Sequence, residues 1–234
     1  TNENDEIMSL SSYLEKMPEN QKNIYYISAE TRSQALASPH LEGFKSKNIP
    51  VLIMTDAIDQ FWLPMIGSFK DKKFTSITQG QINLDDLDEK NKDKKSENKD
   101  QKDKQDKEFV DLIAQMKVVL GEQVKDIRLS SKLTDSPVCL VADDGDMDIA
   151  MEQLMAQRDT NYKGAPRILE INGDHSLIKN MKSLLSKKEN NDLVSDAGTL
   201  LFEQARLLEG KMPADPAQFS KILNQFLLKA INIK

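Results

Sequence analysis

The sequence contains few of the residues on which several common classes of protein depend. One of its 234 residues is a cysteine, Cys139, which excludes an internal disulfide framework and fits a reducing compartment. Its two histidines, His40 and His175, are too few to complete a cysteine- and histidine-rich zinc site. No apolar run approaches the roughly 18 residues of a membrane-spanning helix. We therefore expect no metal site and no membrane partner.

Signatures of nucleic-acid binding and of catalysis are also missing. The 32 basic and 38 acidic residues give a net charge of −6, which argues against a general nucleic-acid partner. There is no Walker motif and no GxGxxG. His40 and His175 lie near expected helix starts, where capping or surface roles are the simpler interpretation. Residues 143–146 (DDGD) lack the later ligands of a calcium loop and predict a turn. We expect no catalytic residue and no bound cofactor in this chain.

The most polar part of the chain is residues 88–108, which hold eight acidic, eight basic and no apolar residues. Such a segment cannot be buried in a core. It fits either a mobile linker or a short charged helix carried by opposite charges four residues apart. Recurring Asp, Asn and Ser, which are poor helix formers, favour the linker. This interpretation divides the chain into residues 1–87 and 109–234.

Residues 1–87 alternate between two kinds of pattern. Short runs of β-branched and aromatic residues predict strands at 24–27, 51–54 and 74–77. Helical patterns lie between and after them, at 31–37, 40–47 and 58–69. Pro64 should kink the last of these helices or end its first part. The alternation predicts a small parallel α/β layer.

Residues 109–234 predict an α+β domain. Apolar residues at 3.6-residue spacing indicate a helix at 109–120, with Gly121 as its stop. Strands are expected at 124–129, 138–141 and 168–171, and further helices at 146–157, 176–187, 193–209 and 216–231. Asp215, Pro216 and Gln218 resemble a capping box at the start of the last helix, and Gly210 closes the helix before it. The last two helices therefore form a hairpin.

Two apolar surfaces are candidates for binding. The first is the helix at 146–157, where Met147, Met151 and Met155 recur every four residues. Ala150 and Leu154 share that face, and Ile149 broadens it. Methionine suits surfaces that adapt to many partners, but the same stripe also fits a buried core, which the pattern alone favours.

The second candidate is the terminal hairpin. Both of its helices carry apolar faces too wide for the other to cover, and on the last helix these residues are Phe219, Ile222, Leu223, Phe226, Leu227 and Ala230. The surplus could pack on the chain's own domain or on a second copy, completing a four-helix bundle. The pattern leaves both possibilities open.

Several motifs resemble a known family. They are residues 13–17 (YLEKM) and 21–27 (QKNIYYI), 38–42 (SPHLE), 51–56 (VLIMTD) with 58–60 (IDQ), 124–129 (VKDIRL), 133–137 (LTDSP) and 169–175 (LEINGDH). In this order they resemble the heat shock protein 90 chaperones, and the bacterial members most closely. Gly173 stands where that family usually has proline. The matches run over nearly the whole chain, so the resemblance is specific.

The resemblance implies that the chain consists of parts of two domains with different roles. Residues 1–87 would be the last, small α/β part of the middle domain, and 109–234 the C-terminal dimerisation domain. The ATP-binding domain would precede Thr1, so the full-length protein would be an ATPase using ATP and Mg²⁺ while this fragment would not be an enzyme. The first residue, which is not Met, also suggests a fragment.

The resemblance further implies partners and the residues that contact them. It implies a homodimer formed by the last two helices, with the interface residues Leu200, Leu201, Leu207, Leu208, Phe219, Ile222, Leu223, Phe226 and Leu227. Partly folded client proteins would contact one of the neighbouring aromatics Phe61 and Trp62, together with Met147, Ile149, Met151, Leu154 and Met155.

The end of the chain, residues 231–234, lacks the acidic pentapeptide with which cytosolic eukaryotic members recruit cochaperones. We therefore expect no such recruitment and a bacterial, cytoplasmic protein, with an organellar member as the second choice. A different class also fits the residues: a stand-alone dimeric α/β interaction module or small enzyme, with the methionine-rich helix buried in its core.

Overall fold

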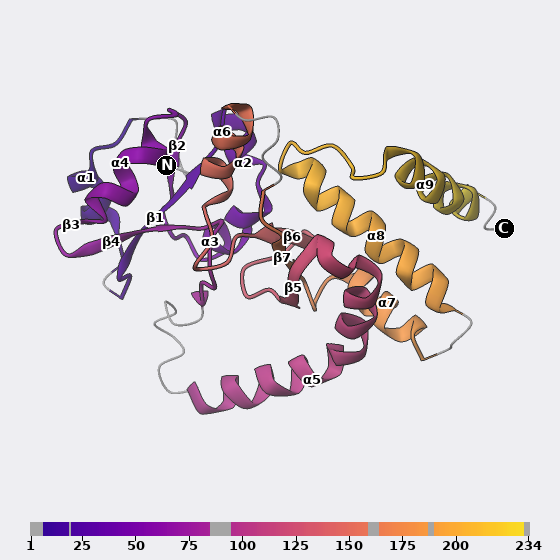
Figure 1. Ribbon diagram of the computed structural model, residues 1–234. Coiled ribbons are helices and arrows are strands. Elements are labelled where there is room, and N and C mark those ends of the chain that lie inside the picture. The colour runs from indigo at the N-terminus through magenta and orange to yellow at the C-terminus, as the bar shows by residue number, and fades with distance from the viewer. Residues whose placement is uncertain (1–6, 19, 85–94, 159–163, 187–189, 232–234) are drawn as a thin grey trace.

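The computed structural model describes residues 7–18, 20–84, 95–158, 164–186 and 190–231. It confirms an α+β fold built around two small sheets. The first sheet belongs to the part before the charged segment and the second to the part after it, and the two parts lie side by side (Figure 1).

The first sheet has the strand order β2-β1-β4-β3. The central strand β1 (Asn23–Ser28) pairs in parallel with β2 (Leu52–Met54) and β4 (Lys72–Ser76), as the sequence predicts. The short strand β3 (Ser68–Phe69) is antiparallel to β4, which corrects the expectation that Phe69 ends a helix. Lys70 and Asp71 both have positive φ and form the two-residue turn of this hairpin.

Helices cover both faces of this sheet. α1 (Leu10–Lys16) and α4 (Asp59–Ile66) pack on Ile24 and Tyr26, while α2 (Arg32–Leu36), η1 (Pro39–Leu41) and α3 (Glu42–Ser46) pack on Tyr25 and Ile27. Because both faces are covered, β1 is a continuous apolar run without alternation. α4 continues two residues beyond Pro64 and ends at Gly67, whose φ is +67°.

The second sheet has the order β5-β7-β6. β5 (Val124–Leu129) is parallel to β7 (Arg167–Ile171), and β6 (Val138–Val141) is antiparallel to it. α5 (Lys95–Leu120), α7 (Ser176–Leu184) and α8 (Asn191–Leu208) build the main core on one face. α6 (Ile149–Arg158) precedes β7, η4 (Gly121–Gln123) connects α5 to β5, and α9 (Pro216–Ile231) ends the described chain.

α5 begins much earlier than the sequence analysis expects. Residues 95–108, assigned there to a linker, form the first half of this helix, and residues 88–94 lie outside the described part. The alternative of a charged helix is therefore correct for residues 95–108. Opposite charges four residues apart in the sequence are the feature on which that alternative rests.

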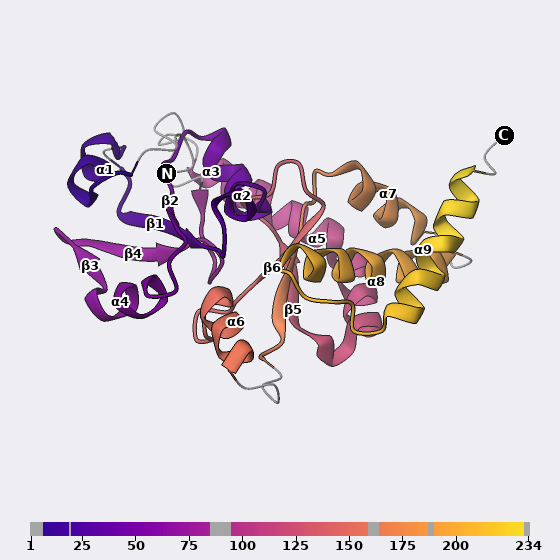
Figure 2. The ribbon, with the colours of Figure 1, turned by 90° about the horizontal axis from the view of Figure 1, so that it is seen from above.

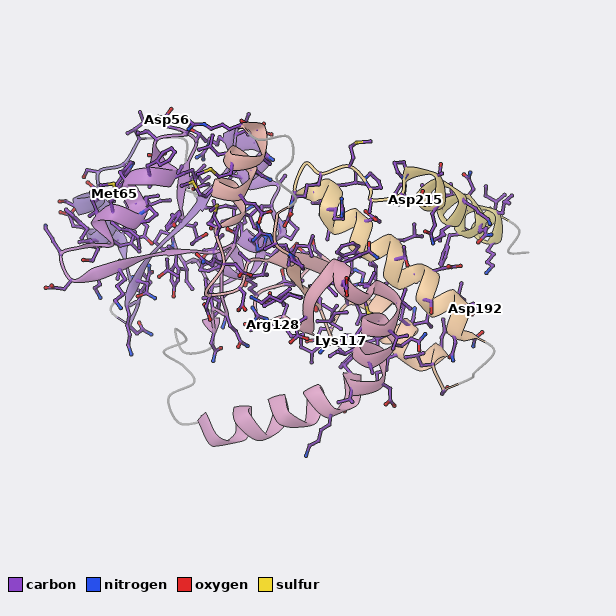
Figure 3. The ribbon with its side chains drawn as sticks, viewed as in Figure 1. Asp56, Met65, Lys117, Arg128, Asp192 and Asp215 are labelled. Carbon is purple, nitrogen blue, oxygen red and sulfur yellow. The ribbon has the colours of Figure 1, made fainter. Side chains whose placement is uncertain are left out.

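The two parts are joined by a network of polar contacts. The Lys132 ammonium group donates to the carbonyl of Ile77 (2.9 Å), and the Arg128 guanidinium donates to the carbonyl of Gly80 (2.9 Å) and to the Glu170 carboxylate. Ser130 also donates to Glu170 (2.9 Å). Strand β5 and the loop after it thus contact the first part directly, through Arg128 and Lys132, and Figure 3 shows Arg128 at this junction.

The sequence motifs meet at the same junction. The carboxylate of Glu42, in the SPHLE motif, accepts hydrogen bonds from the backbone N–H groups of Thr134, Asp135 and Ser136, in the LTDSP motif, at 2.8 to 3.1 Å. Burial alone would raise the pKa of Glu42, but the Ser136 side chain and these N–H groups lower it overall. The sequence analysis assigned no role to these contacts.

Candidate functional site

Helix α6, which carries the methionine stripe, is anchored to both parts of the chain. The carboxylate of Asp148 caps its start by accepting from the N–H of Ala150 (2.9 Å). The same carboxylate accepts hydrogen bonds from Ser76 (2.5 Å), the last residue of β4, and from Thr78 (2.9 Å) just after it. In Figure 2 α6 lies between the two parts. Its position is therefore tied to their junction.

The inward side of α6 is more polar than the apolar stripe suggests. Glu152 is buried and forms ion pairs with Arg167 (2.7 Å) and Lys211 (3.2 Å). Ile149, predicted to contact clients, is 7% exposed and lies on this side. The prediction that Ile149 contacts clients does not match its buried position. The spacing of apolar residues identifies one face of the helix, but it does not show whether that face points to solvent or to the core.

The other predicted residues of this helix lie toward the surface. Met147 is exposed and precedes α6, which begins at Ile149 and not at residue 146 as expected, and Met151, Leu154 and Met155 are half-buried. Among the described residues none of these four side chains belongs to a buried apolar cluster. The stripe therefore does not form the core, which was the interpretation that the pattern alone favoured.

The two neighbouring aromatics of α4 differ in their surroundings. Trp62 packs edge-on against Phe74, with ring centroids 5.8 Å apart, and donates to the Asp59 carboxylate (2.7 Å). Phe61 is half-buried and belongs to no buried apolar cluster of the described residues. Phe61 is therefore the freer of the two side chains.

Sequence reasoning missed three exposed apolar residues around α4, namely Ile58, Met65 and Ile66. Figure 3 shows Met65 on the same part of the molecule as Asp56. The signal was present in residues 61–66 (FWLPMI), which contain no charged residue in a helix with an exposed side. A surface helix of this kind has more apolar area than its own sheet covers.

α4 and α6 border a common cavity of about 270 Å³. Gln60 comes from α4, and Leu154 and Gln157 come from α6, while Glu30 and Asp56 add carboxylates from the loops after β1 and β2. The side chain of Gln157 donates to the Glu30 carboxylate (3.2 Å) across this gap. The structure thus brings the two predicted client-contact segments to the borders of one cavity.

The terminal hairpin has well-defined ends. Gly210, with φ of +76°, donates to the Leu207 carbonyl (2.9 Å), and Lys211 donates to the Arg206 carbonyl (2.9 Å), which is a Schellman motif. The Asp215 carboxylate accepts from the N–H of Gln218 (2.9 Å), which confirms the predicted N-cap of α9.

The predicted interface residues fall into two groups. Leu207, Leu208, Leu223 and Leu227 are exposed, and Leu200, Phe219 and Phe226 are half-buried. Leu201 and Ile222 are 3% and 5% exposed, so these two pack within the chain and are not available to a second copy. α9 lies on α8 at the edge of the molecule (Figures 1 and 2), and Ile222 is its one buried residue. An apolar face of the hairpin therefore remains uncovered.

The residues considered for chemistry have structural roles. The Nδ1 atom of His175 accepts from the N–H of Leu177 (3.1 Å) and caps α7, as expected. His40 is buried, against the expectation of a capping or surface position, because Ser38 is the cap of η1. Burial raises the pKa of the Cys139 thiol, which keeps it protonated and unreactive.

The described part of the chain shows no sign of a metal site or of a membrane span. It contains no group of three His, Cys, Asp or Glu side chains placed to hold a metal ion. Nor does any helix there combine the length and apolar content needed to cross a bilayer. Asp143 and Asp146 form ion pairs with Lys125 at 2.7 and 3.0 Å in the turn that the sequence predicts.

Comparison with known proteins gives a consistent result. The family model described as "Hsp90 protein" matches residues 1–234. "Chaperone protein HtpG" of Roseobacter denitrificans is 39% identical over 228 residues, which are 97% of this chain and 36% of that protein. The proteins of the same name from Streptomyces coelicolor and Wolbachia pipientis are 35% and 36% identical to this chain. The matched residues are 95% and 96% of this chain, and 34% and 35% of those proteins. The chain thus spans about a third of the length of the curated relatives it matches.

Proposed function

Because this chain belongs to the Hsp90 protein family, we propose that it is the carboxyl-terminal part of an ATP-dependent chaperone that holds two protomers together and binds partly folded clients. Residues 1–87 would be the end of the middle domain and residues 109–234 the dimerisation domain. The names of the relatives support the chaperone activity. Their bacterial sources support a bacterial cytoplasmic protein.

The observation that carries the client-binding proposal is the meeting of α4 and α6 at one cavity. Met65 of α4 and Met147, just before α6, are exposed, and Met151 and Met155 of α6 are half-buried. Removing such surface from water stabilises a complex by about 25 cal/mol per Å² before entropic costs. Methionine is flexible and polarizable, so the same surface fits many sequences. Several weak contacts of this kind suit both capture and release of clients.

The experiment that tests this proposal replaces Met151 and Met155 by Ser together. We expect the fragment to keep its thermal midpoint within a few degrees, because neither side chain belongs to the core, and to lose most of its ability to suppress aggregation of an unfolded model protein. The matched control is the pair Val110→Ser and Val118→Ser, two exposed residues of α5. Unchanged aggregation suppression in the α6 variant would contradict the proposal, and a collapse of its midpoint would favour the stand-alone module with a methionine core.

The proposed dimer rests on the uncovered face of the terminal hairpin. Leu223 and Leu227 are one helical turn apart on α9 and are 38% and 49% exposed. A second copy of the hairpin would cover this face and complete a four-helix bundle. The covered area would add to the stability of both copies, which fits a constitutive dimer.

The proposal places the ATPase activity outside this chain. The nucleotide and its Mg²⁺ would bind to the domain that precedes residue 1 in the full-length protein. The neutral buried His40 and the protonated Cys139 offer no reactive group here. The isolated chain should therefore show no ATP hydrolysis, measured as phosphate release, and hydrolysis above the background rate would contradict this division.

A further inference from the structure

A second, smaller cavity, of about 60 Å³, lies where the two parts of the chain meet. The first part contributes the end of β1, α2 and η1, and the second part contributes β6, α6 and the end of α8. Much of the wall is apolar, from residues such as Ala35, Leu140 and Leu208. Polar residues interrupt it, among them Ser28, His40 and Glu209.

Each of these three side chains has a buried polar atom without a hydrogen-bond partner among the described residues. The atoms are Oγ of Ser28, Nδ1 of His40 and both carboxyl oxygens of Glu209. The His40 residue is 6% exposed and the Glu209 side chain 7%. Unpaired polar atoms in protein interiors are rare, and a bound water or ion usually explains them. The Glu209 carboxylate has the Lys211 ammonium group 3.6 Å away, while Oγ of Ser28 and Nδ1 of His40 have no partner of this kind in the part of the chain that the structure describes, and their grouping around one cavity points to bound water.

The state of His40 defines what it offers to that water. Its ring forms a hydrogen bond with the backbone of Leu140, in β6, so His40 itself connects the two parts. Burial and the nearby Lys132 ammonium hold the pKa of His40 well below its ordinary value. The ring is therefore neutral, and the unpaired Nδ1 is a hydrogen-bond acceptor.

At neutral pH the carboxyl group of Glu209, unlike the ring of His40, is close to its pKa. Burial raises the pKa of Glu209 to about 7, against the opposing effects of Lys211 and Arg167, while Glu152 raises it further. The Lys211 ammonium group is 3.6 Å from the carboxylate. The backbone carbonyl of Glu209 accepts a hydrogen bond from Gln153 of α6 (2.7 Å).

We infer that this cavity binds a small cluster of water molecules and one exchangeable proton, carried by Glu209, which together link the two parts of the chain. One water needs about 10–15 Å³ of such space and two to four polar partners, so the cavity has room for a few waters and for no larger ligand. The waters donate to Nδ1 of His40 and exchange hydrogen bonds with Ser28. Protonated Glu209 donates to them.

Loss of the proton weakens the link. An ionised Glu209 carboxylate is a charge held away from water, and this loss of solvation is the largest effect on its pKa. It outweighs the attraction of Lys211 and Arg167, so the charged form favours opening of the site to water. We therefore expect α6 and the strand contacts beside it to be held more firmly below pH 7 than above it. This inference goes beyond client binding and does not depend on it.

The test is an NMR titration of the whole 234-residue chain between pH 5 and 9, following the ring nitrogens of His40 and the carboxyl carbon of Glu209. We expect the Glu209 signal to titrate with a midpoint near 7, the Nδ1 signal of His40 to shift at the same midpoint while the ring stays neutral, and the ring protons to show contacts with long-lived water. A Glu209 midpoint near 4.5, or no water contact at His40, would overturn the inference.

The second measurement reports on the link itself. The N–H of Gly80 bonds to the Ala142 carbonyl (2.8 Å) and the N–H of Ala142 to the Thr78 carbonyl (2.9 Å), across the two parts. We expect hydrogen exchange at these two amides, corrected for intrinsic rates, to accelerate several-fold from pH 6 to pH 8. Glu209→Gln should remove that change, while Glu122→Gln, an exposed residue outside the small cavity, should retain it. The same pH dependence in all three chains would overturn the inference.

Discussion

Glu42 shows how much a single side chain contributes to the junction between the two parts. Its carboxylate holds three consecutive N–H groups of residues 134–136. Glu170 supports the junction indirectly, since it accepts from Arg128, which in turn donates to the carbonyl of Gly80. The sequence showed these residues inside recognisable motifs, but spacing along the chain carries no information on which distant loop a carboxylate meets.

Replacing Glu42 by Gln should lower the free energy of unfolding by about 1–2 kcal/mol, because bonds from N–H groups to a charged acceptor become bonds to a neutral one. Urea denaturation at pH 7 measures this. The control Glu15→Gln, at an exposed position, should change stability by less than about 0.5 kcal/mol.

The same contribution should depend on pH in a defined direction. The pKa of Glu42 is lower in the folded chain than the ordinary value of 4.5, so its stabilising effect is present above pH 4.5 and is lost as the pH falls through the folded pKa. The difference between wild type and Glu42→Gln should therefore shrink below pH 4. A difference that stays constant down to pH 3 would show that the carboxylate charge is not its cause.

At the scale of elements, the sequence located most helices and strands because their signals are local. The strands at 124–129 and 138–141 have the predicted limits, and α9 begins and ends as predicted. The failures have physical causes. β3 is closed by Lys70 and Asp71, which are not a typical turn pair, and α5 begins at Lys95 although poor helix formers recur through its first half. For α6 the spacing defined a face but not its direction, so Ile149 was misplaced.

The two sides of α6 should respond differently to truncation. Ile149→Ala should cost about 2–4 kcal/mol of unfolding free energy, because it leaves a cavity in a buried site. Met147→Ala, at an exposed site two residues before the start of α6, should cost under about 0.5 kcal/mol. Thermal and urea denaturation of both variants measure this, and equal costs would mean that α6 is turned differently from the description above.

The N-cap of α9 offers a test of the terminal hairpin. Asp215→Ala removes the acceptor for the N–H of Gln218 and should destabilise the helix by about 1 kcal/mol. Asp215→Asn keeps an acceptor oxygen and should destabilise the helix by only a few tenths of a kcal/mol. Amide exchange in the first turn of α9 measures the effect, and equal exchange in both variants would show that the cap does not hold this helix.

At the scale of the whole molecule, the proposed client surface and the proposed dimer surface lie at different places. α4 lies in the first part and α6 lies next to it, while α9 lies beside α8 at the opposite edge of the molecule (Figures 1 and 2). A dimer formed through α8 and α9 would leave α4 and α6 of each protomer uncovered. This arrangement would give one assembly two separate client surfaces, which suits a chaperone that holds extended, partly folded chains.

The most direct test of this account is the solution mass of the chain over a dilution series, by sedimentation equilibrium. We expect twice the 26.5 kDa of a single chain at micromolar concentration. Leu223→Asp with Leu227→Asp should reduce the mass to that of one chain, because a carboxylate would be buried in the bundle without a partner. Val118→Asp, at an exposed site of α5, should remain dimeric. A wild-type monomer throughout the series, or a dimer that survives both α9 substitutions, would contradict the account.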